Sequence, residues 1–223
     1  MRGRGLFAAH GLFVTRGLFV TIEGLDGCGK STQAARLADW LEARTGRGVL
    51  RTFEPGGWGG GALRSLILAG DVPDDRTELL LFLADRSGHL ASVVLPAISE
   101  GRIVLCERYS DSTLAYQVWG RGLSEAFVAS LIASCGFLAP DLTVLLDIDA
   151  GTAERRLGGR GGADRIESAG SAFMARVAEG YRELARRSPE RIVVVDADGT
   201  EDEVGTRVES AVLKSLEELL RAG

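Results

Sequence analysis

One nine-residue stretch constrains this 223-residue chain more than any other. Residues 24–32 read G-L-D-G-C-G-K-S-T, which matches the phosphate-binding pattern G-x-x-x-x-G-K-[ST]. The apolar, β-branched residues 18–22 precede it and predict a buried strand, and residues 30–43 follow with apolar side chains at helical spacing. The alternative is an ordinary glycine turn before a helix. The order of strand, glycine-rich loop and helix favours a phosphate site instead.

The chemistry of this loop predicts the donor of a phosphoryl group. Its glycines let successive backbone N–H groups turn towards an anion, and the following helix adds the positive end of its dipole. We expect the Lys30 side chain to reach the β- and γ-phosphates of ATP and the Ser31 hydroxyl to hold Mg²⁺. The residues expected to bind the nucleotide are Gly24, Gly27, Cys28, Gly29, Lys30, Ser31 and Thr32.

Composition narrows the classes of partner. The formal net charge is −5, whereas a non-specific nucleic-acid binder would more often be basic. Apolar residues make up 45 %, but no apolar run approaches the roughly 18 residues of a membrane span. The three cysteines are widely spaced and lack metal-ligand spacing. We therefore expect small-molecule partners, no nucleic acid, no membrane, and free thiols in a reducing cytoplasm.

Strand-like and helix-like runs alternate from residue 18 onwards. Strands are predicted at residues 18–22, 49–53, 103–106, 142–146 and 192–195. Helices are predicted at residues 30–43, 61–68, 76–98, 124–135, 150–157, 171–187 and 201–221. This alternation predicts an α/β fold with a five-stranded parallel sheet flanked by helices on both faces, in a single domain from 18 to 223. Residues 1–17 are predicted to be a disordered extension.

Ligands of such sheets bind beyond the carboxyl ends of the strands, so the residues that follow each strand are candidates. Glu54 follows the second strand in a turn, and Glu107 and Arg108 close the third. Glu107 could bind Mg²⁺ through its carboxylate, and Arg108 could bind a phosphate through two hydrogen bonds. A surface ion pair is the alternative.

Two further groups of residues point to a nucleotide. Phe82 and Arg86 are four apart in a predicted helix and therefore share one face, which suits a nucleobase, although a core Phe with a surface Arg is common. A glycine run at residues 158–162 is flanked by arginines, among them Arg156 and Arg160, and could close over phosphates as a flap. A solvated helix end is the alternative there.

Taken in order, these motifs resemble the thymidylate kinases. The resemblance covers about residues 18–221 and is carried by residues 19–32, 54–57, 81–89, 107–117, 140–143 and 164–167. It implies a P-loop NTPase fold with one nucleoside monophosphate kinase domain and a small lid at about residues 156–166. It also implies transfer of the γ-phosphoryl group of MgATP to dTMP in dTTP synthesis, by a cytoplasmic homodimer.

The resemblance also implies roles for individual residues. Asp26 would meet the 3′-hydroxyl of dTMP, Phe82 would stack on thymine, and Arg86 would bond its ring oxygen. Arg108 would hold the acceptor phosphate, with Glu107 near Mg²⁺. The other expected substrate contacts are Glu54, Arg64, Thr113, Tyr116 and Gln117. The phosphate loop has no arginine of its own, so the resemblance assigns catalysis to Lys30, Arg108 and the lid arginines Arg156 and Arg160.

Some positions depart from the family pattern. Phe53 stands where bacterial members usually have Arg, Glu107 replaces the usual Asp, and Gly88 replaces a usual Gln beside the base site. Two alternatives therefore stay open at this point. One is a kinase for another pyrimidine nucleoside monophosphate such as dUMP, and the other is a catalytically weakened nucleotide-binding homologue.

Overall fold

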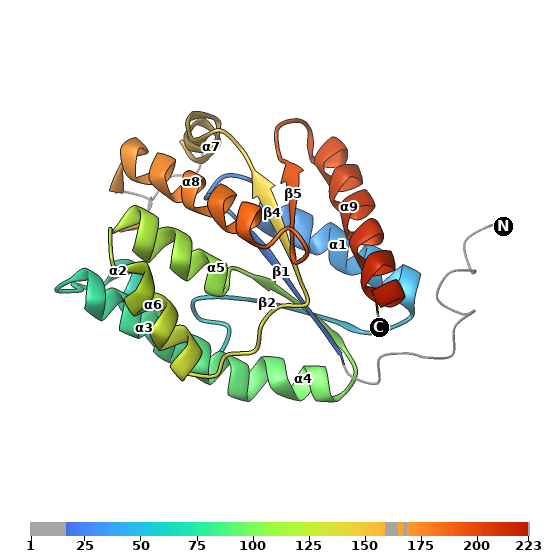
Figure 1. The fold of residues 1–223 in the computed structure, drawn as a ribbon, viewed down its shortest axis with the longest axis horizontal. Helices are drawn as coiled ribbons and strands as arrows, with labels where there is room; N and C mark the ends of the chain where they lie inside the picture. Colours follow the sequence, from blue (N-terminus) through green and yellow to red (C-terminus); the bar gives the residue numbers. More distant parts are fainter. Residues whose placement is uncertain (1–16, 159–164, 167–168, 223) are drawn as a thin grey trace.

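A five-stranded parallel sheet forms the centre of the fold (Figure 1), in a computed structural model that describes residues 17–158, 165–166 and 169–222. The strand order is β2-β3-β1-β4-β5, and every neighbouring pair is parallel. The strands are β1 (Leu18–Gly24), β2 (Val49–Phe53), β3 (Ile103–Glu107), β4 (Leu142–Asp147) and β5 (Ile192–Asp196). The five predicted strands are confirmed. Because β1 is central, the glycine-rich loop leaves the middle of the sheet at its carboxyl edge.

Helices cover both faces, as predicted. On one face α1 (Lys30–Thr45) packs against β1, β2 and β3, and α9 (Glu201–Ala222) packs against β4, β5 and α1. The other face carries α3 (Asp75–His89), a π-helical turn at Leu90–Val94, α4 (Leu95–Ser99), α5 (Ser110–Thr113) and α8 (Ser171–Arg187). The remaining helices described are α2 (Ala62–Ala69), α6 (Glu125–Ser134) and α7 (Ala150–Leu157).

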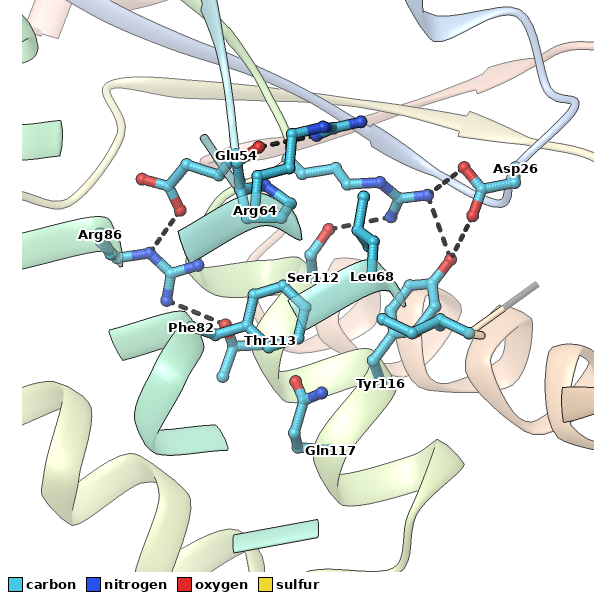
Figure 2. Close-up of a pocket in the computed structure, with 13 residues that line it drawn as sticks. Asp26, Glu54, Arg64, Leu68, Phe82, Arg86, Ser112, Thr113, Tyr116 and Gln117 are labelled. Atoms are coloured by element: carbon cyan, nitrogen blue, oxygen red, sulfur yellow. Dashed lines mark hydrogen bonds and ion pairs between the residues drawn. The ribbon is translucent and has the colours of Figure 1, made fainter. Parts of the chain in front are cut away.

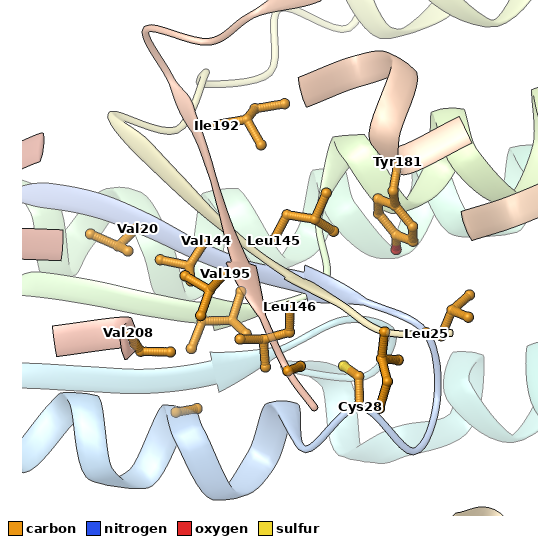
Figure 3. Close-up of a cluster of buried hydrophobic side chains, with 14 of the residues drawn as sticks. Val20, Leu25, Cys28, Val144, Leu145, Leu146, Tyr181, Ile192, Val195 and Val208 are labelled. Carbon is orange, nitrogen blue, oxygen red and sulfur yellow. The ribbon is translucent and has the colours of Figure 1, made fainter. Parts of the chain in front are cut away.

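Side chains of β1 and β3 alternate between two buried clusters. Val20 and Ile22 of β1 join a large cluster that includes Leu37 of α1 (Figure 3). Phe19, on the opposite face of β1, packs edge-on against Tyr109 at 4.8 Å between ring centroids. Both clusters run up to the carboxyl edge of the sheet. They therefore hold the loops that leave this edge against a rigid base.

One helix lies where the sequence pattern predicts none. Chain segment α5 continues into a π-helical stretch at Leu114–Gly120, between the third strand and α6. Its inward face is polar, since Asp111, Ser112, Thr113 and Gln117 are all buried. This helix supplies four residues of the site described below.

The helical run Asp75–Ser99 is long and apolar enough to meet the length and composition test for a membrane span. A core helix can meet the same test, and this run carries buried Glu78, Asp85, Arg86 and His89. Each of these side chains bonds to a group on another element. The run therefore packs as a helix of the domain.

The predicted boundaries can be compared with the fold only in part. Gly17, placed in the extension by the sequence pattern, is buried and donates its N–H to Ile98 O at 2.8 Å. The packed domain thus includes at least this residue. The rest of the predicted extension and residues 159–164 of the predicted lid lie outside the described residues.

Candidate active site

Glycines shape the loop between β1 and α1. Gly24 has φ 140°, and a Cβ there would lie 2.6 Å from Leu146 O at the end of β4. Gly27 has φ 85°, and a Cβ there would overlap Ala153 O of α7. Only glycine fits such a conformation at such a close approach. The loop therefore wraps tightly over the N-terminus of α1, where backbone N–H groups and the helix dipole favour an anion.

Lys30 and Ser31 begin α1 at the mouth of this loop. The buried Lys30 Nζ donates to Gly24 O at 3.1 Å and to Leu25 O at 2.8 Å. Ser31 Oγ donates to Glu107 Oε2 at 2.6 Å, which joins the start of α1 to the end of β3. A hydroxyl and a carboxylate that converge in this way offer the oxygen ligands that Mg²⁺ prefers, so these two residues fit the metal.

The pocket above the loop, here called the loop pocket, opens to solvent and has a cavity volume of about 380 Å³. Most of the predicted nucleotide-binding and metal residues line it, namely Gly27, Gly29, Lys30, Ser31, Thr32 and Glu107. Gly24 and Cys28 are buried behind it, and the Cys28 side chain belongs to the apolar cluster (Figure 3). Burial also raises the pKa of the Cys28 thiol. Of Cys28, only the backbone can therefore contact the nucleotide.

A second pocket, here called the aromatic pocket, has a cavity volume of about 150 Å³ (Figure 2). The structure brings together here all nine residues that the family resemblance predicts for the substrate: Asp26, Glu54, Arg64, Phe82, Arg86, Arg108, Thr113, Tyr116 and Gln117. Pro55, Leu68, Ser112 and Ile166 also line the pocket and are not among the predicted residues.

Arg86 forms a fixed wall of the aromatic pocket. Its Nε donates to Glu54 Oε2 at 2.8 Å, and its Nη1 donates to Thr113 Oγ1 at 2.9 Å. Glu54 is held in turn by His89 Nδ1 at 2.9 Å, and the Arg86 guanidinium lies over the Tyr109 ring. Two acceptors and the rings of Tyr109 and Phe137 thus set the plane of the guanidinium. A guanidinium has five N–H donors, so donors remain for a ligand in the pocket.

Asp26, Glu54, Arg64 and Arg108 line both pockets and mark their junction. Arg108 Nη2 donates to Asp26 Oδ1 at 2.6 Å (Figure 2). Burial disfavours the ionised form of Asp26, but the charges of Arg108 and Lys30 outweigh it and hold the pKa of this carboxyl well below its usual range. Asp26 is therefore ionised at neutral pH and able to accept hydrogen bonds from both sides.

The departure at Phe53 is accompanied by an arginine from another element. The Arg64 guanidinium of α2 lies over the Phe53 ring, 5.3 Å from its centroid, and donates to Pro55 O at 2.7 Å. A cation over an aromatic face is attracted by the ring. Phe53 thus helps to hold Arg64 at the junction, so the junction still has two arginines.

Arg108 adopts a left-handed backbone conformation, with φ 65°. This conformation is rare for a residue with a side chain and persists where surrounding contacts hold it. Glu23, buried at the end of β1, accepts the N–H of the next residue, Tyr109, at 2.7 Å. Its other oxygen accepts from Ser112 Oγ at 2.5 Å and from Tyr181 OH at 3.1 Å. Both hydroxyl oxygens accept from Arg108 Nη1, at 3.3 and 3.4 Å.

Glu23 and Tyr181 therefore hold Arg108 in place, and the sequence pattern predicts a role for neither of them. Burial raises the pKa of Glu23 from 4.5 to about 7, and the nearby Asp111 carboxyl adds to the rise. The only signal in the sequence is an acid inside an apolar, strand-like run. Tyr181 lies more than 150 residues away on α8 and gives no such signal.

The structure also accounts for Gly88. Trp58 Nε1 donates to Asp85 O at 2.8 Å, and its ring lies against Gly88, where a Cβ would overlap Trp58 Cζ2. The Asp85 carboxylate accepts the Gly56 N–H at 3.0 Å. Gly88 therefore makes room for an indole that fastens the loop between β2 and α2 onto α3. The pKa of Asp85 is raised by its burial.

Of the two predicted lid arginines, the structure describes Arg156. Arg156, on α7, donates to Ala197 O at 3.1 Å and to Gly199 O at 3.3 Å. It is not among the residues that line the two pockets. Arg160 lies outside the described residues.

Comparisons with known proteins agree on one family. A family model described as thymidylate kinase matches residues 22–208. The thymidylate kinase of Solidesulfovibrio magneticus is 45 % identical over 215 residues, which cover 88 % of this chain and 99 % of that protein. The thymidylate kinase of Leifsonia xyli is 49 % identical over 194 residues, covering 84 % and 90 %. The crystal structure of thymidylate kinase from Ehrlichia chaffeensis has a TM-score of 0.73 and 28 % identity, and covers 88 % of this chain and 99 % of that one.

Proposed function

The chain belongs to the thymidylate kinase family of nucleoside monophosphate kinases, and we propose that it transfers the γ-phosphoryl group of MgATP to dTMP, giving dTDP and ADP. One observation carries this proposal. The loop pocket and the aromatic pocket share Asp26, Glu54, Arg64 and Arg108, so phosphates bound in the two pockets would meet between two arginines. Phosphoryl transfer requires such positioning and charge neutralisation more than covalent chemistry.

The loop pocket would hold ATP. Lys30 Nζ would exchange its contacts with the carbonyls of Gly24 and Leu25 for the β- and γ-phosphates. Ser31 and Glu107 would hold Mg²⁺, which when bound neutralises charge on these phosphates. The lysine thus supplies N–H donors for the phosphates, and the hydroxyl and the carboxylate supply oxygen ligands for the metal.

The aromatic pocket would hold dTMP. Thymine would stack on Phe82, with a ring oxygen on Arg86, while Thr113 and Gln117 contact the same base edge. The sugar would lie against Tyr116 and its 3′-hydroxyl against Asp26. The acceptor phosphate would lie between Arg108 and Arg64. The support for this placement is that one end of the pocket carries the aromatic and amide groups and the other carries the charged junction (Figure 2).

During transfer, Lys30, Arg108 and the lid arginines Arg156 and Arg160 would neutralise charge on the moving phosphoryl group, without a covalent enzyme intermediate. Arg156 would have to exchange the carbonyls of Ala197 and Gly199 for phosphate oxygens. The departures from the family pattern do not favour a weakened homologue, because Arg64 serves the junction beside Phe53 and Trp58 occupies the space beside Gly88.

We propose further that the enzyme is a cytoplasmic homodimer. Leu66, Leu80 and Leu95 on α2, α3 and α4 are exposed large apolar side chains, which a second copy could cover. Sedimentation equilibrium of the purified protein should give twice the chain mass. A single chain mass at micromolar concentration would contradict the dimer without touching the activity.

The proposed activity is tested by ADP release from MgATP with a panel of nucleoside monophosphates. We expect kcat/KM for dTMP to exceed that for dUMP by roughly tenfold or more, since one methyl group in an apolar pocket gives about that discrimination. Other monophosphates should be far poorer substrates. Lys30→Ala should lower kcat by orders of magnitude while circular dichroism stays unchanged.

Each contrary result points to a different alternative. If the enzyme prefers dUMP or another monophosphate, that nucleotide and not dTMP is its substrate. ATP binding without turnover on any monophosphate would support the weakened homologue.

A further inference from the structure

Glu78 on α3 is a buried carboxylate that touches the aromatic pocket only through another residue. Its side chain is 2 % exposed. Oε1 accepts from Gln117 Nε2 at 3.0 Å and from Arg121 Nε at 3.2 Å. Oε2 accepts from Arg121 Nη2 at 3.0 Å and lies 2.6 Å from Arg165 Nη2. Two arginines and one amide therefore converge on a single carboxylate.

The protonation state of Glu78 follows from these contacts. Burial disfavours its ionised form, but the hydrogen bond and charge of Arg121 and the hydrogen bonds of Arg165 and Gln117 outweigh this and lower the pKa of the carboxyl. Ionised Glu78 can only accept hydrogen bonds. The Gln117 amide must therefore present its NH₂ group to Glu78, and its carbonyl oxygen must face the other way. Figure 2 shows this oxygen turned towards Phe82 and Thr113, inside the pocket.

Resting on the proposed function, we infer that Glu78 is a positioning residue that makes the base site selective for pyrimidines with a protonated N3. Its effect passes through the Gln117 amide, whose only hydrogen-bonding group towards the base is then an acceptor. Beside it, Arg86 presents donors. An acceptor next to a donor complements the N3–H and O4 of thymine or uracil.

The same pair opposes cytosine, whose N3 accepts and whose exocyclic N4 donates. A site built to hydrogen-bond one pattern rejects the reverse pattern strongly, because buried polar groups are left unpaired. The ring N1 carries the sugar, which the charged junction holds at the opposite end of the pocket. The edge formed by N3 and C4 therefore points at Arg86, Thr113 and Gln117.

The variant Glu78→Gln tests this role directly. Its new amide would keep its oxygen at the Oε2 position, where Arg121 and Arg165 both donate. Its NH₂ group would then lie at the Oε1 position, where it loses the contact with Arg121 Nε and donates to Gln117, which would turn its own NH₂ group into the pocket. The side chain keeps its size, so the shape of the pocket is unchanged.

The probe is the 5′-monophosphate of the 2-pyrimidinone deoxyriboside, whose N3 is an acceptor and whose C4 carries only hydrogen. This nucleotide isolates the contact at N3 from the contact between Arg86 and O4. The measured quantity is the ratio of kcat/KM for dTMP to kcat/KM for this analogue. We expect Glu78→Gln to lower the ratio by roughly tenfold to a hundredfold, with the KM for MgATP unchanged.

Two further variants make the result specific. Glu125→Gln removes an exposed carboxylate that pairs with Arg187, and it should leave the ratio unchanged. If Glu78→Gln folds poorly, Glu78→Asp keeps the charge for Arg121 and Arg165 but is one methylene too short to hold Gln117 as well. The ratio should fall in that variant too.

The contrary results are distinct. If either Glu78 variant lowers kcat/KM for both nucleotides in proportion, Glu78 is a structural residue only and the inference is overturned. If the unchanged enzyme does not phosphorylate dTMP at all, the proposed function fails, and this inference fails with it.

Discussion

Glu23 shows how much of this site depends on a residue that lines neither pocket. It is buried at the end of β1 and faces Arg108, Tyr109, Asp111, Ser112 and Tyr181. Its carboxyl group orients the Ser112 and Tyr181 hydroxyls, and their oxygens accept from Arg108. These contacts hold Arg108 in its rare backbone conformation and keep its guanidinium directed towards Asp26.

The raised pKa of Glu23 predicts a pH-dependent stability. Between pH 4.5 and about 7, folded Glu23 keeps its proton while the unfolded chain loses it. Its contribution to the free energy of unfolding is therefore complete below 4.5 and is lost as the pH rises through 7. The loss amounts to about 3 kcal/mol over that interval. Glu23→Gln has no proton to lose, so its unfolding free energy, measured by urea titration, should fall less from pH 5 to pH 8.

The comparison uses Glu125→Gln as its control, because Glu125 is half exposed and lies away from this cluster. The control should follow the unchanged protein at every pH. Parallel curves for Glu23→Gln and the unchanged protein would show that Glu23 does not bind its proton more tightly in the fold.

At the scale of elements, the strands were predictable and one helix was not. The inner strands β3, β1 and β4 are mostly apolar runs buried on both faces, which gives a plain signal, and the edge strands β2 and β5 are apolar runs that are partly exposed. Helix Ser110–Thr113 and its continuation to Gly120 bury polar side chains, such as Asp111 and Gln117, that line or support the site. A search for an apolar stripe misses such a helix, and Ser, Asp and Thr are poor helix formers.

The candidate site divides in the same way. Eight of the nine residues predicted for the substrate stand in the motifs that resemble the thymidylate kinases, and Arg64 is predicted from that resemblance without standing in one of them. The contacts of Glu23 with Tyr181 and of Glu78 with Arg165 join residues 158 and 87 positions apart. No local pattern marks them, because only the packing of separate elements brings them together.

The contact between Trp58, in the loop after β2, and α3 predicts how one added methyl group at Gly88 changes the stability of the protein. Gly88 lies inside α3, where Gly→Ala ordinarily stabilises a helix by up to about 1 kcal/mol. Here the added Cβ would overlap the Trp58 ring, so Gly88→Ala should destabilise the protein by about 1–3 kcal/mol. Thermal or urea unfolding measures the difference.

The matched background is Trp58→Ala, which removes the overlapping ring. In that background Gly88→Ala should become neutral or stabilising, so the two changes should not be additive. Stabilisation by Gly88→Ala with Trp58 in place would contradict the tight contact.

At the scale of the whole molecule, the central strand β1 joins two half-sites. The loop at its carboxyl end forms one pocket, and α3, α5 and the loop after β2 form the other. Asp26 comes from the phosphate loop itself, yet it pairs with Arg108 and Tyr116 of the second pocket. Because the two pockets share residues, they form one continuous site with room for two nucleotides.

The most direct test of this claim is the affinity for a bisubstrate compound in which adenosine and thymidine are joined through their 5′ positions by five phosphates. If both pockets are parts of one site, isothermal titration should show one compound per chain, bound roughly a hundredfold or more tightly than ATP or dTMP alone. Lys30→Ala and Phe82→Ala should each weaken this binding. An affinity no greater than that for ATP, or no effect of Phe82→Ala, would contradict the account.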